Sequence, residues 1–240
     1  MNVGSYFFSH KLVLMMYRAR PASKTQYPHL HKIIAEVAHK AGIPKPKVYI
    51  IPSESPNAFA TGRNPKNGVV ACTEGIMQLL SERELKGVIA HEMAHIKNRD
   101  ILIQTVAATI AGVISYVAMM ARWGAMFGGF GGDDRDGENI IGLLALAILT
   151  PIIALIIQLA ISRSREYLAD ERGAQFIGDP KSLASALHKL ETGTKHVPLR
   201  FGNKTTSSLF IANPFSSSGL FALFSTHPPM KERIARLNRM

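Results

Sequence analysis

Two long stretches without charged residues dominate the hydrophobic pattern of this chain. The first runs from Ile101 to Ala121 and the second from Ile140 to Ile161. About 20 apolar residues in a helix cross the roughly 30 Å hydrocarbon core of a bilayer, so both stretches predict transmembrane helices. Pro151 predicts a kink in the second, which membrane helices tolerate. The alternative is two buried helices of a soluble protein, because Gln104 and Gln158 soften the apolar pattern.

The charges around these stretches predict their orientation. The intervening loop, 122–139, is rich in glycine and carries its acidic residues between 133 and 138. The outer flanks are basic, with Lys97 and Arg99 before the first stretch and Arg163 and Arg165 after the second. Positively charged flanks stay on the cytoplasmic side of a membrane, so we expect the loop to face outward.

Shorter periodic segments before the first stretch predict helices and strands. Residues 27–40 carry apolar side chains at helical spacing and end at Gly42, a helix stop. Residues 48–51 and 69–72 read as strands, and 58–60 as a short extended piece between them. These segments predict a small, largely antiparallel sheet. Further helices are expected at 74–80, 81–97, 162–176, 182–191 and 231–237.

The helix predicted at 81–97 begins with a capping box and contains a metal-binding motif. Residues 91–95 read HEMAH, an instance of HExxH. Residues four apart share a helix face, so His91 and His95 can offer two imidazole nitrogens to one Zn²⁺. Glu92 lies about 100° round the same turn, where a carboxylate can reach the metal's water without ligating the metal. This arrangement is typical of a hydrolase, and paired surface or core histidines are the alternative.

A third zinc ligand is predicted on the helix at 162–176. A catalytic zinc with two histidines needs one more protein ligand and an open position, and Glu166 can supply the ligand. Asp170 shares its helix face and is placed to accept the outer N–H of a ligating histidine. The alternative is that both carboxylates pair with neighbouring arginines on a solvated face.

The composition of the chain limits the classes of binding partner that it could have. The formal net charge of +11 could indicate a nucleic-acid partner, but the chain has no zinc knuckle, helix-turn-helix or basic-aromatic RNA signature. Anionic lipid at the cytoplasmic face explains the charge more simply, so we expect a lipid bilayer partner and no nucleic acid. Cys72 is the single cysteine, so an intrachain disulfide is excluded. Its short apolar setting, VVACT, indicates a buried thiol on a strand.

The C-terminal region holds two further features. The stretch from Gly193 to Thr226 is too long for an ordinary connector. It could form a lid, for which 203–226 is the candidate part, dip into the membrane or pack on the core. His227 precedes Pro228 and Pro229, which hold it rigidly ahead of the last helix.

Four separated motifs carry a resemblance to a known family. They are PNAFATG at 56–62, HEMAHIKNRD at 91–100, SRSREYLAD at 162–170 and STHPPMKERI at 225–234. In this order they closely resemble the HtpX-type integral-membrane zinc metallopeptidases, relatives of the CAAX prenyl protease. Members of that family usually carry two further membrane spans ahead of a stretch like YFFSHKLVLMMYRARP, which lies at 6–21 here.

The resemblance implies a role for each matching residue. It implies one zinc per subunit and a substrate-binding edge at 57–60. The implied zinc ligands are His91, His95 and Glu166. Glu92 would be the general base, and Asp170 would lie behind the ligands. His227 and Arg233 would stabilise the transition state, and substrate would bind at Asn57, Ala58, Phe59 and Ala60.

The predicted fold is α+β and mostly helical: a zincin-like metalloprotease domain with a small antiparallel sheet and a transmembrane helical hairpin. Residues 1–100 and 162–240 form the two parts of the catalytic domain, and 101–161 form the hairpin. The predicted protein is a zinc-dependent endopeptidase of the cell membrane, multi-pass, that cleaves misfolded membrane or membrane-adjacent polypeptides at the cytoplasmic face. The alternative is a chaperone-like or scaffolding membrane protein with a vestigial zinc site.

Overall fold

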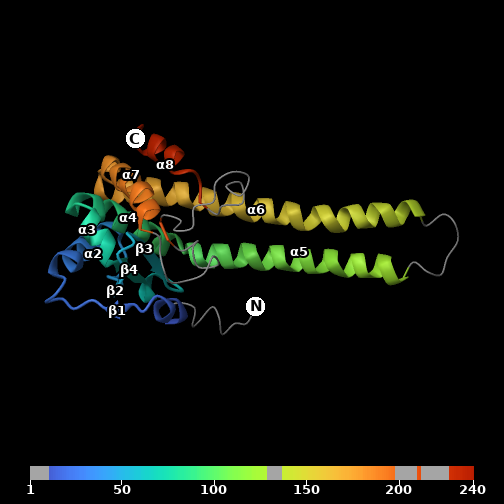
Figure 1. The fold of residues 1–240 in the computed structure, drawn as a ribbon, viewed down its shortest axis with the longest axis horizontal. Helices are drawn as coiled ribbons and strands as arrows, with labels where there is room; N and C mark the ends of the chain where they lie inside the picture. Colours follow the sequence, from blue (N-terminus) through green and yellow to red (C-terminus); the bar gives the residue numbers. More distant parts are fainter. Residues whose placement is uncertain (1–10, 129–136, 198–209, 212–226) are drawn as a thin grey trace. The chain divides into compact units, whose positions relative to one another are not determined.

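The chain forms two compact units (Figure 1). The structure is a computed structural model that describes residues 11–128, 137–197, 210–211 and 227–240. The first unit contains Met1–Leu102 and Arg163–Met240, and the second contains Ile103–Ser162. Of the stretch 203–226, for which a lid is one of three alternatives, all but 210–211 lies outside the described residues, as do residues 129–136 of the predicted outward loop.

The predicted helices and strands are confirmed, with boundary shifts of a few residues. The longest shift is at α5, which continues seven residues beyond the predicted 101–121. The elements are β1 (Arg20–Pro21), α2 (Pro28–Ala41), β2 (Lys47–Ile51), β3 (Ala58–Thr61), the 3-10 helix η1 (Pro65–Asn67), β4 (Val69–Thr73), α3 (Glu74–Leu79), α4 (Glu82–Asn98), α5 (Asp100–Gly128), α6 (Gly137–Ile177), α7 (Pro180–His196) and α8 (Met230–Leu237).

The sheet is small and has the strand order β1-β2-β4-β3. Two pairs, β1–β2 and β3–β4, are antiparallel, whereas the central pair β2–β4 is parallel. The sheet is therefore mixed, and the prediction of an antiparallel sheet is corrected at its centre. The chain leaves β2 for the far edge, forms β3 there, and returns through η1 so that β4 inserts between β2 and β3. In this arrangement β4 runs parallel to β2 and antiparallel to β3.

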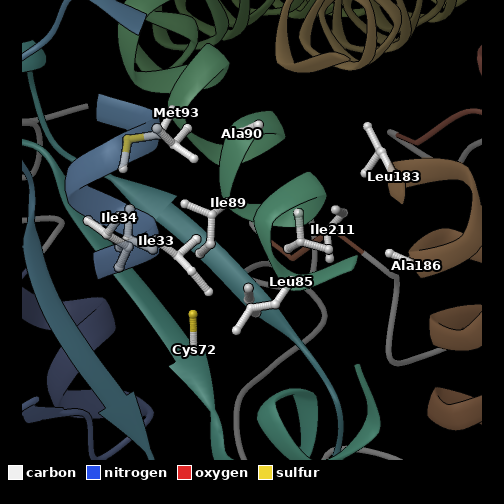
Figure 2. Packing of buried hydrophobic residues seen from close by; sticks show 14 of the residues in the cluster. Ile33, Ile34, Cys72, Leu85, Ile89, Ala90, Met93, Leu183, Ala186 and Ile211 are labelled. Carbon is white, nitrogen blue, oxygen red and sulfur yellow. The ribbon is translucent and has the colours of Figure 1, made fainter. Parts of the chain in front are cut away.

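Helices cover one face of this sheet and form the main core (Figure 2). Figure 2 shows Ile89 and Met93 of α4 close to Ile33 and Ile34 of α2, with the Cys72 thiol of β4 beneath them. Burying one such aliphatic side chain contributes about 1.5–3 kcal/mol, so this face fixes α4 firmly against the sheet. Cys72 is buried, as predicted, and burial, followed by the nearby Glu92 carboxylate, raises the pKa of its thiol to about 12.

A second, smaller core covers the other face. Phe59 of β3 and Phe210 pack edge to face with ring centroids 5.3 Å apart, and Tyr17 meets Phe210 at 4.9 Å. Aromatic pairs in this geometry add about 0.5–1.5 kcal/mol beyond their buried area. Because successive side chains of a strand point to opposite faces, Phe59 faces this core while Ala58 and Ala60 face the helices.

The second unit consists of the apolar parts of α5 and α6. Within the described residues, Asp100–Gly124 and Ile148–Ile177 are long and apolar enough to cross a membrane. Large apolar side chains along them are exposed, among them Val113, Tyr116 and Ile156. The 41 residues of α6 run through Pro151 as one helix, so the same helix continues from the apolar stretch into the first unit. The predicted kink at Pro151 stays a prediction.

Glu84 connects the start of α4 to α7. The capping box is confirmed: Ser81 accepts the backbone N–H of Glu84, and the Glu84 carboxylate accepts the backbone N–H of Ser81 at 2.8 Å. The same carboxylate accepts hydrogen bonds from Ser185 at 2.6 Å and from Lys189 at 2.7 Å. Burial opposes ionisation of Glu84, but these bonds outweigh burial and lower its pKa to about 2.

We expect Glu84→Gln to lower the free energy of unfolding at pH 7 by about 2 kcal/mol, because it removes charge-assisted hydrogen bonds. A carboxyl whose folded pKa is depressed stabilises the fold above its unfolded pKa of 4.5 and loses that contribution as the pH falls toward 2. The difference between parent and variant should therefore shrink between about pH 4.5 and pH 2. Denaturant unfolding of the detergent-solubilised chain measures this difference at each pH.

The matched control is Glu82→Gln, because Glu82 lies in the same first turn of α4 but is exposed. It shares the interaction with the helix dipole without the bonds to α7. An equal loss of stability in both variants would contradict the role assigned to the Glu84 network.

Candidate metal centre

Two imidazoles of α4 face each other across one helical turn. The Nε2 atoms of His91 and His95 lie 3.0 Å apart, and the rings meet at 90°. His91 is fully buried, and the His95 side chain is 17% exposed. The four-residue spacing places both rings on one side of the helix, as the sequence motif requires.

The carboxylate of Glu166 on α6 completes a group of three donors. Its Oε1 lies 3.5 Å from His95 Nε2, and its Oε2 lies 3.8 Å from His91 Nε2. Tetrahedral zinc with bonds of 2.0–2.2 Å holds two donors about 3.4 Å apart. The three observed separations, all between 3.0 and 3.8 Å, fit this spacing. In the described part of the chain, His91, His95 and Glu166 therefore form a group that can hold Zn²⁺.

A glycine allows α6 to approach α4 so closely. A Cβ atom on Gly173 would lie 2.8 Å from the backbone nitrogen of His91 and 3.0 Å from its Cα. Such distances are shorter than carbon contacts allow, so only glycine fits at this crossing. The close approach keeps the carboxylates on α6 within reach of the two imidazoles.

Glu92 is buried beside the three donors and is held by the sheet. The backbone N–H of Ala60 on β3 donates a hydrogen bond to its carboxylate. Burial raises the pKa of Glu92 to about 8, the charge of Glu166 adds to the effect, and His95 opposes it. The contact with Ala60 joins the acid of the HExxH motif to the strand that the sequence predicts as the substrate edge.

Behind His91 lies the carboxylate of Asp170. Asp170 Oδ1 is 2.9 Å from His91 Nδ1. Arg233 of α8 donates to Asp170 from Nε at 2.8 Å and from Nη2 at 2.7 Å, which is a two-bond ion pair. Burial opposes ionisation of Asp170, but Arg233 outweighs it and holds the pKa of Asp170 below its usual range.

Arg233 and His227 both approach the carboxylate of Glu166. Arg233 is fully buried, with Nη1 3.3 Å from Glu166 Oε2, and His227 Nδ1 is 3.1 Å from the same oxygen. Burial opposes ionisation of Glu166, but interactions with His227, Arg233 and His95 hold its pKa well below the usual range. Glu166 is thus an ionised carboxylate in a buried site.

Ala58, Phe59 and Ala60 lie in β3, which is an edge strand of the sheet, and Asn57 directly precedes it. The backbone of Asn57 is hydrogen-bonded inward to Thr73, the last residue of β4. The carbonyl of Ala58 accepts the backbone N–H of Ile211 at 3.2 Å, and Ala60 donates to Glu92. The predicted edge therefore lies beside the three donors, and Ile211 reaches it at Ala58.

Sequence reasoning assigned no role to Asp100, which lies behind His95. Asp100 Oδ2 is 2.7 Å from His95 Nδ1, and Arg165 donates to its Oδ1 at 2.6 Å. Burial favours the neutral ring of His95, but the hydrogen bond to Asp100 and the charge of Glu166 outweigh burial and raise the pKa of His95 to about 9. The one signal in the sequence was a carboxylate close behind the HExxH motif.

Ile211 was also missed, because no local pattern marks it. It is buried in the main core, its N–H pairs with Ala58, and its carbonyl accepts a hydrogen bond from Arg233 at 3.3 Å. The sequence around it is a long stretch of small and polar residues with scattered apolar positions. Such a pattern does not specify which strand the residue pairs with.

Comparison with known proteins places this site in a family. A family model for Peptidase family M48 matches residues 24–240. A "Protease HtpX homolog" of Syntrophobacter fumaroxidans is 54% identical over 242 residues, with 100% of this chain and 86% of the relative covered. A "Protease HtpX homolog" of Thermodesulfovibrio yellowstonii is 57% identical over 240 residues, with 100% of this chain and 85% of the relative covered.

A solved structure shows the same fold. The crystal structure of S. mikatae Ste24p has a TM-score of 0.65 and 20% sequence identity, and the similarity covers 98% of this chain and 55% of that chain. The predicted fold class is confirmed by this likeness together with the helices and small sheet described above. The resemblance predicted from the four motifs is confirmed as well. This chain belongs to peptidase family M48 and is a metallopeptidase that uses zinc.

Proposed function

We propose that this M48 peptidase is an endopeptidase that cleaves misfolded membrane or membrane-adjacent proteins at the cytoplasmic face, with Glu92 as its general base. One observation carries the proposal: two imidazoles, a carboxylate and a second buried acid converge beside an edge strand. The three donors lie within 4.8 Å of one another, and Glu92 is hydrogen-bonded to Ala60 on that strand.

We assign His91, His95 and Glu166 as the residues that hold zinc. Bound zinc supplies a Lewis acid that polarises the scissile carbonyl and makes water nucleophilic near neutral pH. Two histidines and one glutamate are the protein donors of catalytic zinc sites, whereas structural sites use four protein ligands. Among the described residues, the group that can hold a metal consists of these three.

Glu92 moves the proton in this proposal. It takes a proton from the water as the water oxygen bonds to the carbonyl carbon of the substrate. When the C–N bond breaks, Glu92 delivers that proton to the leaving amine nitrogen, so it ends the cycle as it began. Its burial and its fixed contact with Ala60 favour this role, because a general base must be held within hydrogen-bond reach of the proton it moves.

His227 and Arg233 provide the positive side of the site. Both lie within 3.3 Å of Glu166 Oε2, close to where negative charge develops on the carbonyl oxygen. Donors held in place before the reaction stabilise that charge without reorganisation. We assign His227 to the developing oxyanion. The role of Arg233 in the transition state is proposed to be exerted through Glu166 and Asp170, which it holds from a fully buried position.

The substrate is proposed to bind as an extended strand along Asn57, Ala58, Phe59 and Ala60. An added strand is held by main-chain hydrogen bonds, which suits unfolded polypeptides of varied sequence. Ala60 touches Glu92, so a strand at this edge places its backbone beside the general base. The contact of Ile211 with Ala58 must open where the substrate pairs with that carbonyl.

We propose that residues 101–161 span the membrane twice, while 1–100 and 162–240 form one catalytic domain on the cytoplasmic side. The exposed apolar side chains of α5 and α6 support this, because lipid removes the cost of contact with water. Lys97 and Arg99 precede the first span, and Arg163 and Arg165 follow the second. The net charge of +11 fits an anionic lipid surface.

Membership of a peptidase family disfavours the alternative of a chaperone-like or scaffolding protein with a vestigial site.

Glu166→Ala should reduce zinc binding from about one ion per chain to well below half, because two imidazoles alone hold zinc weakly. Elemental analysis of the purified full chain after dialysis measures the zinc content. Glu171→Gln is the matched control, since Glu171 lies on the same helix but is exposed. Full zinc content in Glu166→Ala would move the third ligand elsewhere.

Glu92→Gln should keep the zinc and lower kcat for an unfolded polypeptide such as casein by about 10²–10⁴-fold, because the amide cannot take a proton. A protease assay combined with zinc analysis of the same sample separates chemistry from metal loss. Removal of zinc from the parent by a chelator should abolish cleavage, and added zinc should restore it. Wild-type cleavage by Glu92→Gln would show that another group acts as the base.

Membrane orientation is testable by thiol labelling, because the native Cys72 is buried and should react slowly. In sealed vesicles, a Cys at the exposed Lys66 position is expected to react with an impermeant maleimide only when the cytoplasmic side is open to the reagent. A Cys at Asp134 should react only from the opposite side. Labelling of both positions from one side would exclude the proposed hairpin.

A further inference from the structure

The Nδ1 side of His95, which faces away from the three metal donors, contacts Asp100, and Arg165 contacts Asp100 in turn. His95 Nδ1 lies 2.7 Å from Asp100 Oδ2. Arg165 donates to Asp100 Oδ1 from Nε at 2.6 Å, and its Nη2 contacts the same oxygen. Asp100 is 2% exposed. A buried carboxylate needs such partners, and here they are one imidazole and one guanidinium.

We propose that Asp100 and Arg165 are positioning residues for the zinc site: Asp100 fixes the tautomer and the ring orientation of His95, and Arg165 holds Asp100. The proposal rests on the assignment of His95 as a zinc ligand. It gives a function to two residues that are not themselves among the three metal donors.

The tautomer follows from hydrogen-bond chemistry. A neutral imidazole carries one N–H, and an ionised carboxylate can only accept hydrogen bonds. Asp100 therefore favours the proton on Nδ1 of His95, which leaves the lone pair on Nε2. That Nε2 lies 3.0 Å from His91 Nε2 and 3.5 Å from Glu166 Oε1, so the lone pair is on the side of the donors. Metal-ligating histidines are commonly oriented in this way.

The backbone between the two residues is shaped for this contact. In an uninterrupted helix, a residue five positions after His95 would lie about 140° round the axis and could not face it. Instead α4 ends at Asn98, the capping residue Arg99 has φ 54° in the left-handed region, and α5 begins at Asp100. A non-glycine residue adopts this conformation at a cost of about 1 kcal/mol. The turn brings the Asp100 carboxylate back to the ring.

A carboxylate and an arginine are arranged in the same way behind His91. Asp170 lies 2.9 Å from His91 Nδ1, and Arg233 donates two hydrogen bonds to Asp170. Each imidazole thus has its Nε2 toward the metal group and its Nδ1 against a carboxylate that an arginine holds. Two copies of one arrangement, each with its own carboxylate and its own arginine, indicate that the arrangement serves the histidines.

Arg165 also links this pair to the third donor. It immediately precedes Glu166 on α6, and its side chain reaches Asp100 at the start of α5. The ion pair therefore fixes the first turn of α5 against the turn of α6 that carries the glutamate. A purely structural ion pair would tie the helices together without affecting the metal, and the experiment must separate these two roles.

The test measures zinc affinity of the full detergent-solubilised chain by competition with a chromophoric chelator. Asp100→Asn should weaken zinc binding by about 10–100-fold, because the amide can donate to Nδ1 and favour the wrong tautomer. Arg165→Gln should weaken it by a smaller factor, and the double variant should bind no more weakly than Asp100→Asn, since Arg165 acts through Asp100. Glu171→Gln should bind as the parent does.

Cobalt substitution gives a readout that a structural role would not move. The visible absorption of Co²⁺ in the site should differ between Asp100→Asn and the parent, because the orientation of one ligand ring changes. Zinc affinity within twofold of the parent and an unchanged cobalt spectrum in Asp100→Asn would overturn the proposal, even if thermal unfolding of the metal-free protein shifts. If Asp100→Asn does not fold, Arg165→Gln decides, and parental zinc affinity in that variant overturns the proposal.

The same measurements separate this inference from the proposed function. If the parent binds zinc and Glu166→Ala does not, parental affinity in Asp100→Asn defeats only the positioning role. A parent that binds no zinc, or a Glu166→Ala variant with parental affinity, would defeat the ligand assignment and the inference together.

Discussion

The whole site depends on keeping four carboxylates together away from water. Glu92, Asp100, Glu166 and Asp170 are each at most 4% exposed. An unpaired buried charge costs several kcal/mol, so each of these acids requires a partner. Arginines hold Asp100 and Asp170, a backbone N–H holds Glu92, and Glu166 lies among two histidines and an arginine. The zinc that this family uses adds two positive charges at the centre of the group.

This requirement explains why several helices meet at one place. The helix α4 supplies both imidazoles from one turn, and α6 supplies Glu166 and Asp170 from the adjacent turns. Gly173 lets these two helices approach to backbone contact, and Arg233 of α8 contacts both carboxylates of α6. The packing thus brings the charges together at fixed separations, which is the condition for electrostatic catalysis without reorganisation.

The sheet holds the backbone beside the site in position and does not supply the charged groups. Apolar side chains on both faces fix β3 and β4, so the Ala60 N–H points at Glu92 from a rigid strand. The proposed edge for an extended polypeptide and the proposed general base are therefore held by the same strand. Rigid neighbours of this kind keep a catalytic group within the small tolerance that the chemistry needs.

Helical periodicity and residue chemistry were enough, from the sequence alone, to place His91, Glu92 and His95 on one turn and to mark Glu166 and Asp170 as a pair four residues apart. These are short-range relations, because the helix itself fixes them. The tertiary structure alone decided that Arg99 turns the chain so that Asp100 reaches His95, that Ile211 pairs with Ala58, and that β4 runs parallel to β2. Such contacts depend on how distant segments pack, and no local pattern of side chains encodes that packing.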